Sequence, residues 1–138
     1  MDNKVIYTDD DRCWFDFDGM LHRDDGPAIE FTNGTKQWYQ HGMLHRDDGP
    51  AVEYADGTMS WYLHDLLHRD DGPAVEYTRG TKLWCQHGLL HRADGPAGEY
   101  ADGTMSWYLH DQCLTFDEWL NKVDMSDEDK VMLKLEYG

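Results

Sequence analysis

The sequence predicts a mainly β fold, an elongated repeat sheet of stacked antiparallel β-hairpins that ends in a small α-helical C-terminal cap. The segment Leu-His-Arg-Asp-Asp-Gly-Pro-Ala begins at Leu21, Leu44 and Leu67, and begins again at Leu90 with one substitution, always 23 residues further on. A fixed period of this size is typical of stacked-repeat proteins. Each period also contains a hairpin signal, and the repetition stops before two short stretches that carry helix N-cap residues.

The composition indicates a folded and strongly acidic protein. Its 138 residues carry a formal net charge of −16. Such a charge argues against direct binding to nucleic acid or to an anionic membrane, since both need Lys and Arg patches. The three cysteines, Cys13, Cys85 and Cys113, show no pairing pattern, and neither a signal peptide nor a long apolar run is found. We therefore expect a cytoplasmic protein whose partner, if charged, is basic.

Residues 1–20 are predicted to form a degenerate N-terminal capping repeat. Two strands, over residues 5–8 and 12–15, flank an acidic turn around Asp10-Asp11. Terminal repeats of an array are atypical because they must close the exposed edge of the sheet.

Four 23-residue β-hairpin repeats are predicted over residues 21–112. In the first repeat, Asn33-Gly34 suits a two-residue type I′ turn, which sets the pairing of the two strands. In that register Ile29 faces Trp38 and lies on the same face of the sheet. We therefore expect an apolar face with a row of tryptophans, and an opposite face that carries the Glu and Tyr rows.

The repeat pattern stops at Asp111, and residues 113–138 are predicted to form a helical C-terminal cap. Thr115 and Glu118 have the spacing of a capping box, and Ser126 offers a second N-cap. The apolar residues that follow these caps are expected to lie against the last hairpin.

The repeat unit, built as Trp-Tyr-x-x-Gly-x-x-His, then Asp-Gly, a strand, a Gly turn and another Trp, resembles the MORN repeat. It is most similar to a variant array with the motif Leu-His-Arg-x-Asp-Gly-Pro-Ala, common in bacterial and phage genomes. The resemblance covers residues 21–112 well and 5–20 weakly, and it departs from the usual pattern at Arg23-Asp24, where a typical repeat has Gly after His. It implies a row of hairpins that serves as a binding or assembly scaffold. MORN proteins have been linked to membranes, dimerisation and docking of proteins, but the excess of acid here argues against an anionic membrane surface.

The eight histidines all lie in the repeats, and three pairs have a His-x-x-x-His spacing. This spacing binds zinc when it lies on a helix. Here it lies in loops, and equivalent copies are expected about 10 Å apart because each repeat adds two strands. We expect structural hydrogen bonds, with neither a metal site nor a cofactor.

Repeated polar residues are the candidates for binding. The arginines could form a ladder of ion pairs and turn caps with neighbouring aspartates, or the Arg and His rows could capture an anionic ligand such as a nucleotide. The Glu and Tyr rows could receive a basic peptide or a helix, or could be a solvated outer face. The Arg and His rows are Arg23, Arg46, Arg69, Arg92, His22, His45, His68 and His91. The Glu and Tyr rows are Glu30, Glu53, Glu76, Glu99, Tyr39, Tyr62 and Tyr108.

No catalytic residues are assigned. The serines lack a Gly-x-Ser-x-Gly context, no glycine-rich phosphate loop occurs, and polar residues repeated four times do not form the single asymmetric arrangement of an active site. The favoured function is a noncatalytic protein-interaction scaffold that binds a partner with a basic or aromatic surface along its repeat sheet, with a homodimer as an open option. The alternative is a phage-type acidic inhibitor of host defence, acting as a DNA-mimic decoy or by sequestering a nucleotide signal.

Overall fold

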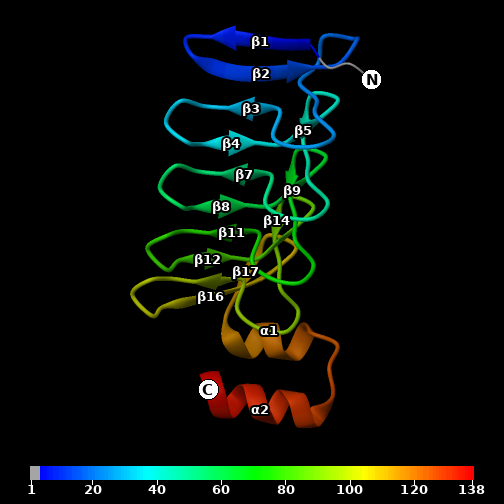
Figure 1. Ribbon diagram of the computed structural model, residues 1–138. Helices are drawn as coiled ribbons and strands as arrows, with labels where there is room; N and C mark the ends of the chain where they lie inside the picture. The colour runs from blue at the N-terminus through cyan, green and yellow to red at the C-terminus, as the bar shows by residue number, and fades with distance from the viewer. Residues whose placement is uncertain (1–3) are drawn as a thin grey trace.

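The computed structural model describes residues 4–138 of the chain. One antiparallel sheet has 11 strands in the order β1-β2-β3-β4-β7-β8-β11-β12-β15-β16-β17, and three two-stranded ribbons accompany it. The hairpins stack from the N-terminal end to the C-terminal end, where two helices follow (Figure 1). The prediction of a mainly β sheet of stacked antiparallel hairpins with C-terminal helices is confirmed. Residues 1–3 of the predicted N-terminal capping repeat lie outside the described residues.

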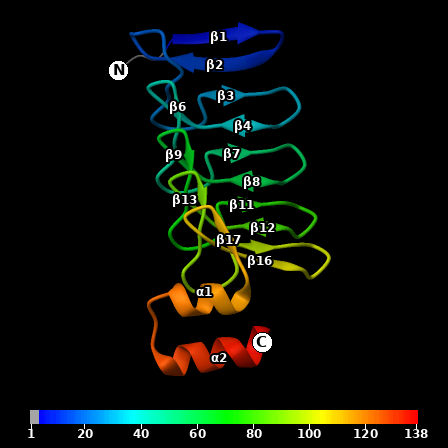
Figure 2. The same cartoon turned by 180° about the vertical axis from the view of Figure 1, so that it is seen from behind.

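The strands of the sheet are short, and each repeat contributes two of them. They are β1 (Lys4–Thr8), β2 (Asp11–Phe15), β3 (Ile29–Glu30), β4 (Lys36–Gln37), β7 (Val52–Glu53), β8 (Met59–Ser60), β11 (Val75–Glu76), β12 (Lys82–Leu83), β15 (Gly98–Glu99), β16 (Met105–Leu109) and β17 (Gln112–Leu114). The ribbons are β5 (Tyr39–Gln40) with β6 (Met43–Leu44), β9 (Tyr62–Leu63) with β10 (Leu66–Leu67), and β13 (Cys85–Gln86) with β14 (Leu89–Leu90). They form a second column beside the hairpins (Figures 1 and 2).

The hairpin register differs from the predicted one by one residue. Ile29 pairs with Gln37 and Glu30 pairs with Lys36, so Trp38 does not face Ile29. The other three repeats keep the same register. Since neighbouring residues of a strand point to opposite faces, the predicted face with a common row of apolar residues and tryptophans is wrong.

The turn explains this shift. Of Asn33 and Gly34, only Gly34 has a positive φ, of 96°. Its N–H donates to the Phe31 carbonyl at 3.0 Å, while the Asn33 side-chain oxygen accepts a hydrogen bond from the Thr35 N–H at 2.9 Å. This is a three-residue loop, a type I turn followed by a glycine bulge. The loop is one residue longer than the predicted type I′ turn, which moves the pairing by one position.

Two-residue turns with positive φ at both positions occur elsewhere, in the ribbons and in the first hairpin. His41 and Gly42, with φ of 48° and 82°, join β5 to β6. Asp and Gly tolerate this left-handed region better than most residues do. The equivalent pairs are His64-Asp65, His87-Gly88 and His110-Asp111, and Asp9-Asp10 joins β1 to β2 in the same way.

Small residues lie where successive repeats meet. The Ala51 carbonyl accepts a hydrogen bond from the Trp38 N–H of the preceding repeat at 2.7 Å. Alanine is fully buried at this position in all four repeats, at Ala28, Ala51, Ala74 and Ala97. The hairpins therefore approach one another closely here, and a larger side chain would have no room.

A hydrophobic core lies at the C-terminal end of the array. Helix α1 (Phe116–Lys122) starts at the predicted capping box of Thr115 and Glu118, and α2 (Asp127–Tyr137) starts after the predicted N-cap Ser126. The buried residues of this core are Trp107, Leu114, Trp119, Leu120 and Val123. Helix α1 thus covers the last hairpin with apolar side chains, as the sequence predicts. The apolar residues Val131, Met132 and Leu135 of α2 are 55 to 77% exposed, so the prediction that they lie against the hairpin is wrong.

Candidate interaction grooves

The arginine of each repeat is held by four contacts. The Arg46 guanidinium carbon lies 3.9 Å from the centroid of the Trp38 ring. Arg46 Nε donates to an Asp48 carboxylate oxygen at 3.1 Å. Its Nη1 donates to the Pro50 carbonyl at 3.1 Å and to a Glu53 carboxylate oxygen at 3.2 Å. The guanidinium group is therefore neutralised by two carboxylates and covered by an aromatic ring.

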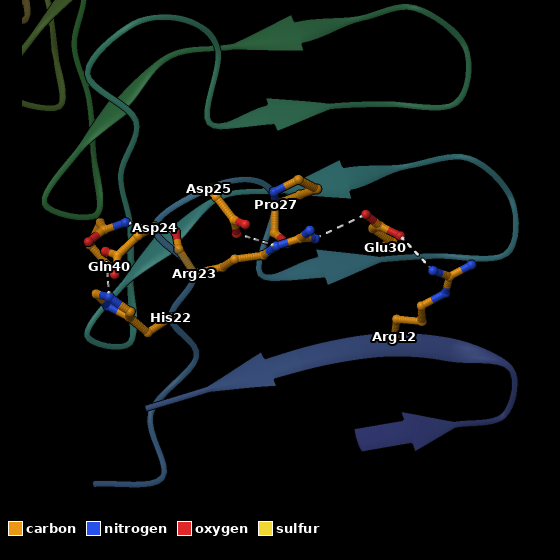
Figure 3. A network of polar contacts seen from close by, with 8 residues as sticks. All are labelled: Arg12, His22, Arg23, Asp24, Asp25, Pro27, Glu30 and Gln40. Carbon is orange, nitrogen blue, oxygen red and sulfur yellow. Dashed lines mark hydrogen bonds and ion pairs between the residues drawn. The ribbon is translucent and has the colours of Figure 1, made fainter. Parts of the chain in front are cut away.

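The same arrangement surrounds the other three arginines. Figure 3 shows it for Arg23, which bonds Asp25, Pro27 and Glu30, while Arg12 of β2 reaches the other oxygen of Glu30 at 3.8 Å. Arg69 and Arg92 repeat these contacts at distances between 2.8 and 3.3 Å. The predicted ladder of ion pairs is thus present in the structure.

The tryptophan beneath each arginine belongs to the preceding repeat. Arg69 covers Trp61 and Arg92 covers Trp84, in both cases at 3.9 Å. The guanidinium also lies close to a glycine: a Cβ atom on Gly72 would stand 2.9 Å from Arg69 Cζ. A larger residue in the Asp-Gly-Pro motif would therefore force the arginine to shift.

This stacking was not predicted from the sequence. Two regularities could have pointed to it: a Trp lies eight residues before Arg46, Arg69 and Arg92 and nine before Arg23, and a Gly lies three residues after each Arg. A partner eight residues away is not expected from strand or helix periodicity. The contact depends on the way one repeat folds back over the previous one.

Each histidine pair joins the start and the end of one repeat, rather than the two histidines of a His-x-x-x-His segment. His45 Nδ1 accepts a hydrogen bond from the His64 backbone N–H at 3.1 Å, and its Nε2 lies 2.8 Å from Asp47. Nδ1 must therefore be unprotonated and Nε2 carries the proton. The two imidazole rings lie 4.5 Å apart. The other pairs are His22–His41, His68–His87 and His91–His110, with ring centroids 4.3 to 4.6 Å apart.

One group within residues 4–138 has the residue types of a metal site. The ligand atoms of Asp16, His22 and His41 lie within 4.8 Å of one another. His22 Nδ1 accepts a hydrogen bond from the His41 N–H at 3.0 Å, and His22 Nε2 lies 2.9 Å from Asp24. A cation bound through either nitrogen of His22 would have to displace one of these bonds. The geometry favours the expected hydrogen-bonding role of these histidines.

The Glu and Tyr rows do not share a face. Glu30 lies on the face opposite to Ile29 and Gln37, and its carboxylate bonds Arg23. The Tyr39 hydroxyl instead donates to Gln37 at 3.2 Å. The predicted joint acidic and aromatic stripe is therefore wrong, because the one-residue shift separates its two components.

Three tyrosines of the repeats, Tyr39 in β5, Tyr62 in β9 and Tyr108 in β16, are partly buried. Burial raises the pKa of both Tyr39 and Tyr62, with smaller contributions from the nearby charge of Asp65 and from Tyr54. Tyr108 also has a raised pKa, mainly through its hydrogen bond with Cys113. Their hydroxyls stay protonated at neutral pH and act as hydrogen-bonding groups within the fold.

Three grooves between successive repeats open on the Arg side of the part of the chain that the structure describes. The first groove, between repeats one and two, and the second, between repeats two and three, each have a volume of about 670 Å³. Both are lined by the Arg-Asp-Asp segments of two adjacent repeats, the Gly-Pro that follows the first of these segments, a Trp and a His, but the first groove has Gln40 where the second has Leu63. The third groove, between repeats three and four, has about 1000 Å³ and also includes residues of the helical cap.

Carboxylates dominate the rims of these grooves. The aspartate side chains are 70 to 87% exposed, whereas those of the arginines are only 19 to 23% exposed. A ligand in a groove therefore meets negative charge first. The rim aspartates are Asp24, Asp25, Asp47, Asp48, Asp70, Asp71 and Asp94.

Comparison with known proteins adds no family to this description. No protein-family model matches the chain, and no curated protein matches it. Within residues 4–138, no helix is both long enough and apolar enough to cross a membrane.

Proposed function

We propose that this protein is a noncatalytic interaction scaffold that binds a partner protein through the row of grooves along its repeats. The observation that carries the proposal is the repetition of one groove with the same Arg, Asp, Gly-Pro, Trp and His lining, its rim of exposed aspartates facing outward. Such similar grooves at a regular spacing suit an extended partner that makes the same contact several times. The similarity of the repeat unit to MORN repeats supports the same function.

The partner that fits these grooves is basic. Its Lys or Arg side chains would meet the rim aspartates, and opposite charge across an interface steers association and selects partners. The Arg and His rows serve this function indirectly, because they hold the Asp-Asp loops in place. The Arg rows suit a phosphate-bearing ligand less well, since each guanidinium already bonds two carboxylates and a carbonyl.

The strong negative charge favours a second candidate function, that of an acidic inhibitor that occupies a nucleic-acid-binding protein. A formal charge of −16 with exposed aspartates along one side would attract a DNA-binding surface. This candidate predicts a complex that dissociates as the salt concentration rises, because the Debye screening length falls to about 3 Å at 1 M salt. A scaffold complex that also buries aromatic and apolar groups should persist.

The test compares partner capture by wild-type protein and by the triple variant Asp24→Asn, Asp47→Asn, Asp70→Asn. Repeat four already has Ala93 at this position, so a neutral residue is compatible with the fold. The control removes three acids outside the grooves, with Asp10→Asn, Glu128→Gln and Glu136→Gln. Loss of the captured protein with the groove variant alone is the expected result. Equal capture by both variants would refute the groove proposal.

Salt then separates the two candidate functions. A nucleic-acid enzyme that is captured at low salt and released at high salt would support the inhibitor. A protein that is retained at high salt by the wild type, and lost from the groove variant, would support the scaffold.

A further inference from the structure

The third groove differs from the other two in size and in chemistry. It extends from repeats three and four to the segment between α1 and α2 and to α2 itself, which increases its volume to about 1000 Å³. The cap contributes both carboxylates and apolar side chains to its lining, namely Asp124, Met125, Asp129, Met132 and Leu133.

The groove keeps a strong negative charge. Arg69 and Arg92 lie in its wall, but Arg69 is paired with Asp71 and Glu76, and Arg92 makes the equivalent two ion pairs. Asp124 and Asp129 add two carboxylates on the side of the cap. A cationic side chain that enters the groove would therefore find carboxylates on both walls.

The same groove has apolar side chains of the helical cap that the other two lack. Met132 is 64% exposed although it lies in a groove, and Met125 and Leu133 lie in the same lining. Methionine side chains are flexible and polarisable, so they adapt to different apolar partners. Ala93 replaces the aspartate found at this position in the other repeats, which removes one charge beside this surface.

We propose that the third groove is a specific docking site for a peptide segment of a partner that carries arginine or lysine next to large apolar side chains. This inference rests on the proposed scaffold function and deepens it: the first two grooves attract positive charge, and the third also selects apolar side chains. Charge complementarity and the exposed methionine determine the choice of occupant. An acidic peptide would be repelled, and a polar basic peptide would leave Met132 in water.

The experiment uses the full chain and two synthetic pentapeptides of equal charge. The probe is acetyl-Arg-Leu-Arg-Phe-Arg-amide, and the matched peptide has serine in place of leucine and phenylalanine. Titration followed by NMR reports on each groove separately, through the indole N–H signals of Trp38, Trp61 and Trp84 and the methyl signal of Met132. We expect the probe to move the Trp84 and Met132 signals first, and the serine peptide to bind at least tenfold more weakly, because a tenfold loss corresponds to only about 55 Å² of apolar surface left unburied.

Two pairs of variants locate the contact. Met132→Ser should weaken probe binding about fivefold, whereas Leu135→Ser, on the same helix but outside the groove, should leave it unchanged. Asp129→Asn should weaken binding more than Asp127→Asn, since both lie in the first turn of α2 and only Asp129 lines the groove.

The outcomes separate this inference from the proposed function. Equal shifts at Trp38, Trp61 and Trp84, or shifts at the first two alone, would overturn the special role of the third groove and leave the scaffold function supported. Equal affinity for the two peptides would also overturn it. If neither peptide moved any of these signals at millimolar concentration, both the docking site and the basic-partner form of the scaffold would be refuted.

Discussion

Arg69 is in contact with residues of two successive repeats. Its guanidinium group stacks on Trp61 of the previous repeat, and its ion pairs connect Asp71 and Glu76 of its own repeat. The side chain is 22% exposed, so these contacts are only partly screened by water. A planar group with several donors is needed, because one side chain must stack on a ring and reach three acceptors at once.

Arg69→Lys should therefore destabilise the protein by about 1 to 3 kcal/mol, as expected for the loss of hydrogen bonds to charged groups. Lysine keeps the charge but cannot stack and bond in this geometry. Urea unfolding followed by tryptophan fluorescence measures the change. Arg79→Lys, in an exposed turn, is the control and should leave the midpoint unchanged. Equal stability of the two variants would contradict the role given to the stacked arginine.

The three cysteines should differ in reactivity because their surroundings differ. Burial raises the pKa of Cys85 to about 11, whereas Cys113 is exposed. Only the thiolate reacts with disulfide reagents, so Cys85 should be protected in the folded protein. Ellman's reagent near neutral pH should modify Cys113 rapidly and Cys85 only after urea is added. A Cys113→Ser variant should lose the fast phase, which assigns that phase to Cys113. Rapid reaction of Cys85 in the folded protein would argue against its burial.

The hairpin is the element for which the sequence-based prediction was partly right. The period, the number of hairpins and their antiparallel stacking follow from the repeated motif and the Gly turns. The register does not, because Asn33-Gly34 fits both a type I′ turn and a type I turn with a bulge. All four repeats adopt the second turn, and repeat three does so with Arg79 in place of the Asn or Asp that accepts the threonine N–H elsewhere.

The candidate site was predictable to a similar degree. The Arg–Asp ion pairs follow from neighbours in the sequence, and they were expected. The stacking of Arg46 on Trp38 was not, because it depends on how one repeat lies over the next. The pairing of His45 with His64 was not either, because it depends on how the two ends of one repeat fold together. The extra residues of the third groove come from the path of the chain between α1 and α2, which no repeat pattern describes.

Among the helices, α1 holds the end of the array in place. Trp119 is fully buried, its ring lies 4.6 Å from Trp107, and its indole N–H donates to the Arg92 carbonyl at 2.9 Å. In the first repeat the equivalent donor to the Arg23 carbonyl is the Gln40 side chain. The helix thus supplies a donor that the fourth repeat lacks, since Leu109 stands at the position of Gln40.

Trp119→Ala should cost about 3 to 5 kcal/mol, the usual range for removing a buried tryptophan. Leu135→Ala is the control, since Leu135 is 77% exposed on α2 and its loss should have little effect. Thermal and urea unfolding measure both. Comparable losses in the two variants would mean that α1 does not anchor the last repeat.

For the whole molecule, the free energy of unfolding should decrease in two separate ranges as the pH is lowered. Burial, with a smaller contribution from His110, lowers the pKa of His91 below 6.5. The unfolded state then binds more protons, so this stability is present above pH 6.5 and is lost as the pH falls from there towards the folded pKa. Hydrogen bonds from Thr58 and Thr104 lower the pKa of Asp56 and Asp102. Their contribution is present above about pH 4 and is lost as the pH falls further.

Urea unfolding between neutral pH and about pH 3 should show both losses. His91→Asn isolates the first, because an asparagine oxygen can accept the hydrogen bond of the His110 N–H but does not titrate. The variant should lose less stability than wild type between neutral pH and the acidic range. A pH dependence identical to that of wild type would exclude His91 as the group responsible.

The stacking of each arginine on the tryptophan before it gives the array a direction. The arginine of each repeat covers the tryptophan ring of the preceding repeat, and its own tryptophan is covered by the arginine of the following repeat. The repeats can therefore stack in one direction only. The last ring, Trp107, has Thr115 at the position of the next arginine and is covered instead by Phe116, Trp119 and Tyr137. An inserted pair of repeats would therefore extend the protein without altering either end, and the number of grooves offered to a partner could change by gene duplication alone.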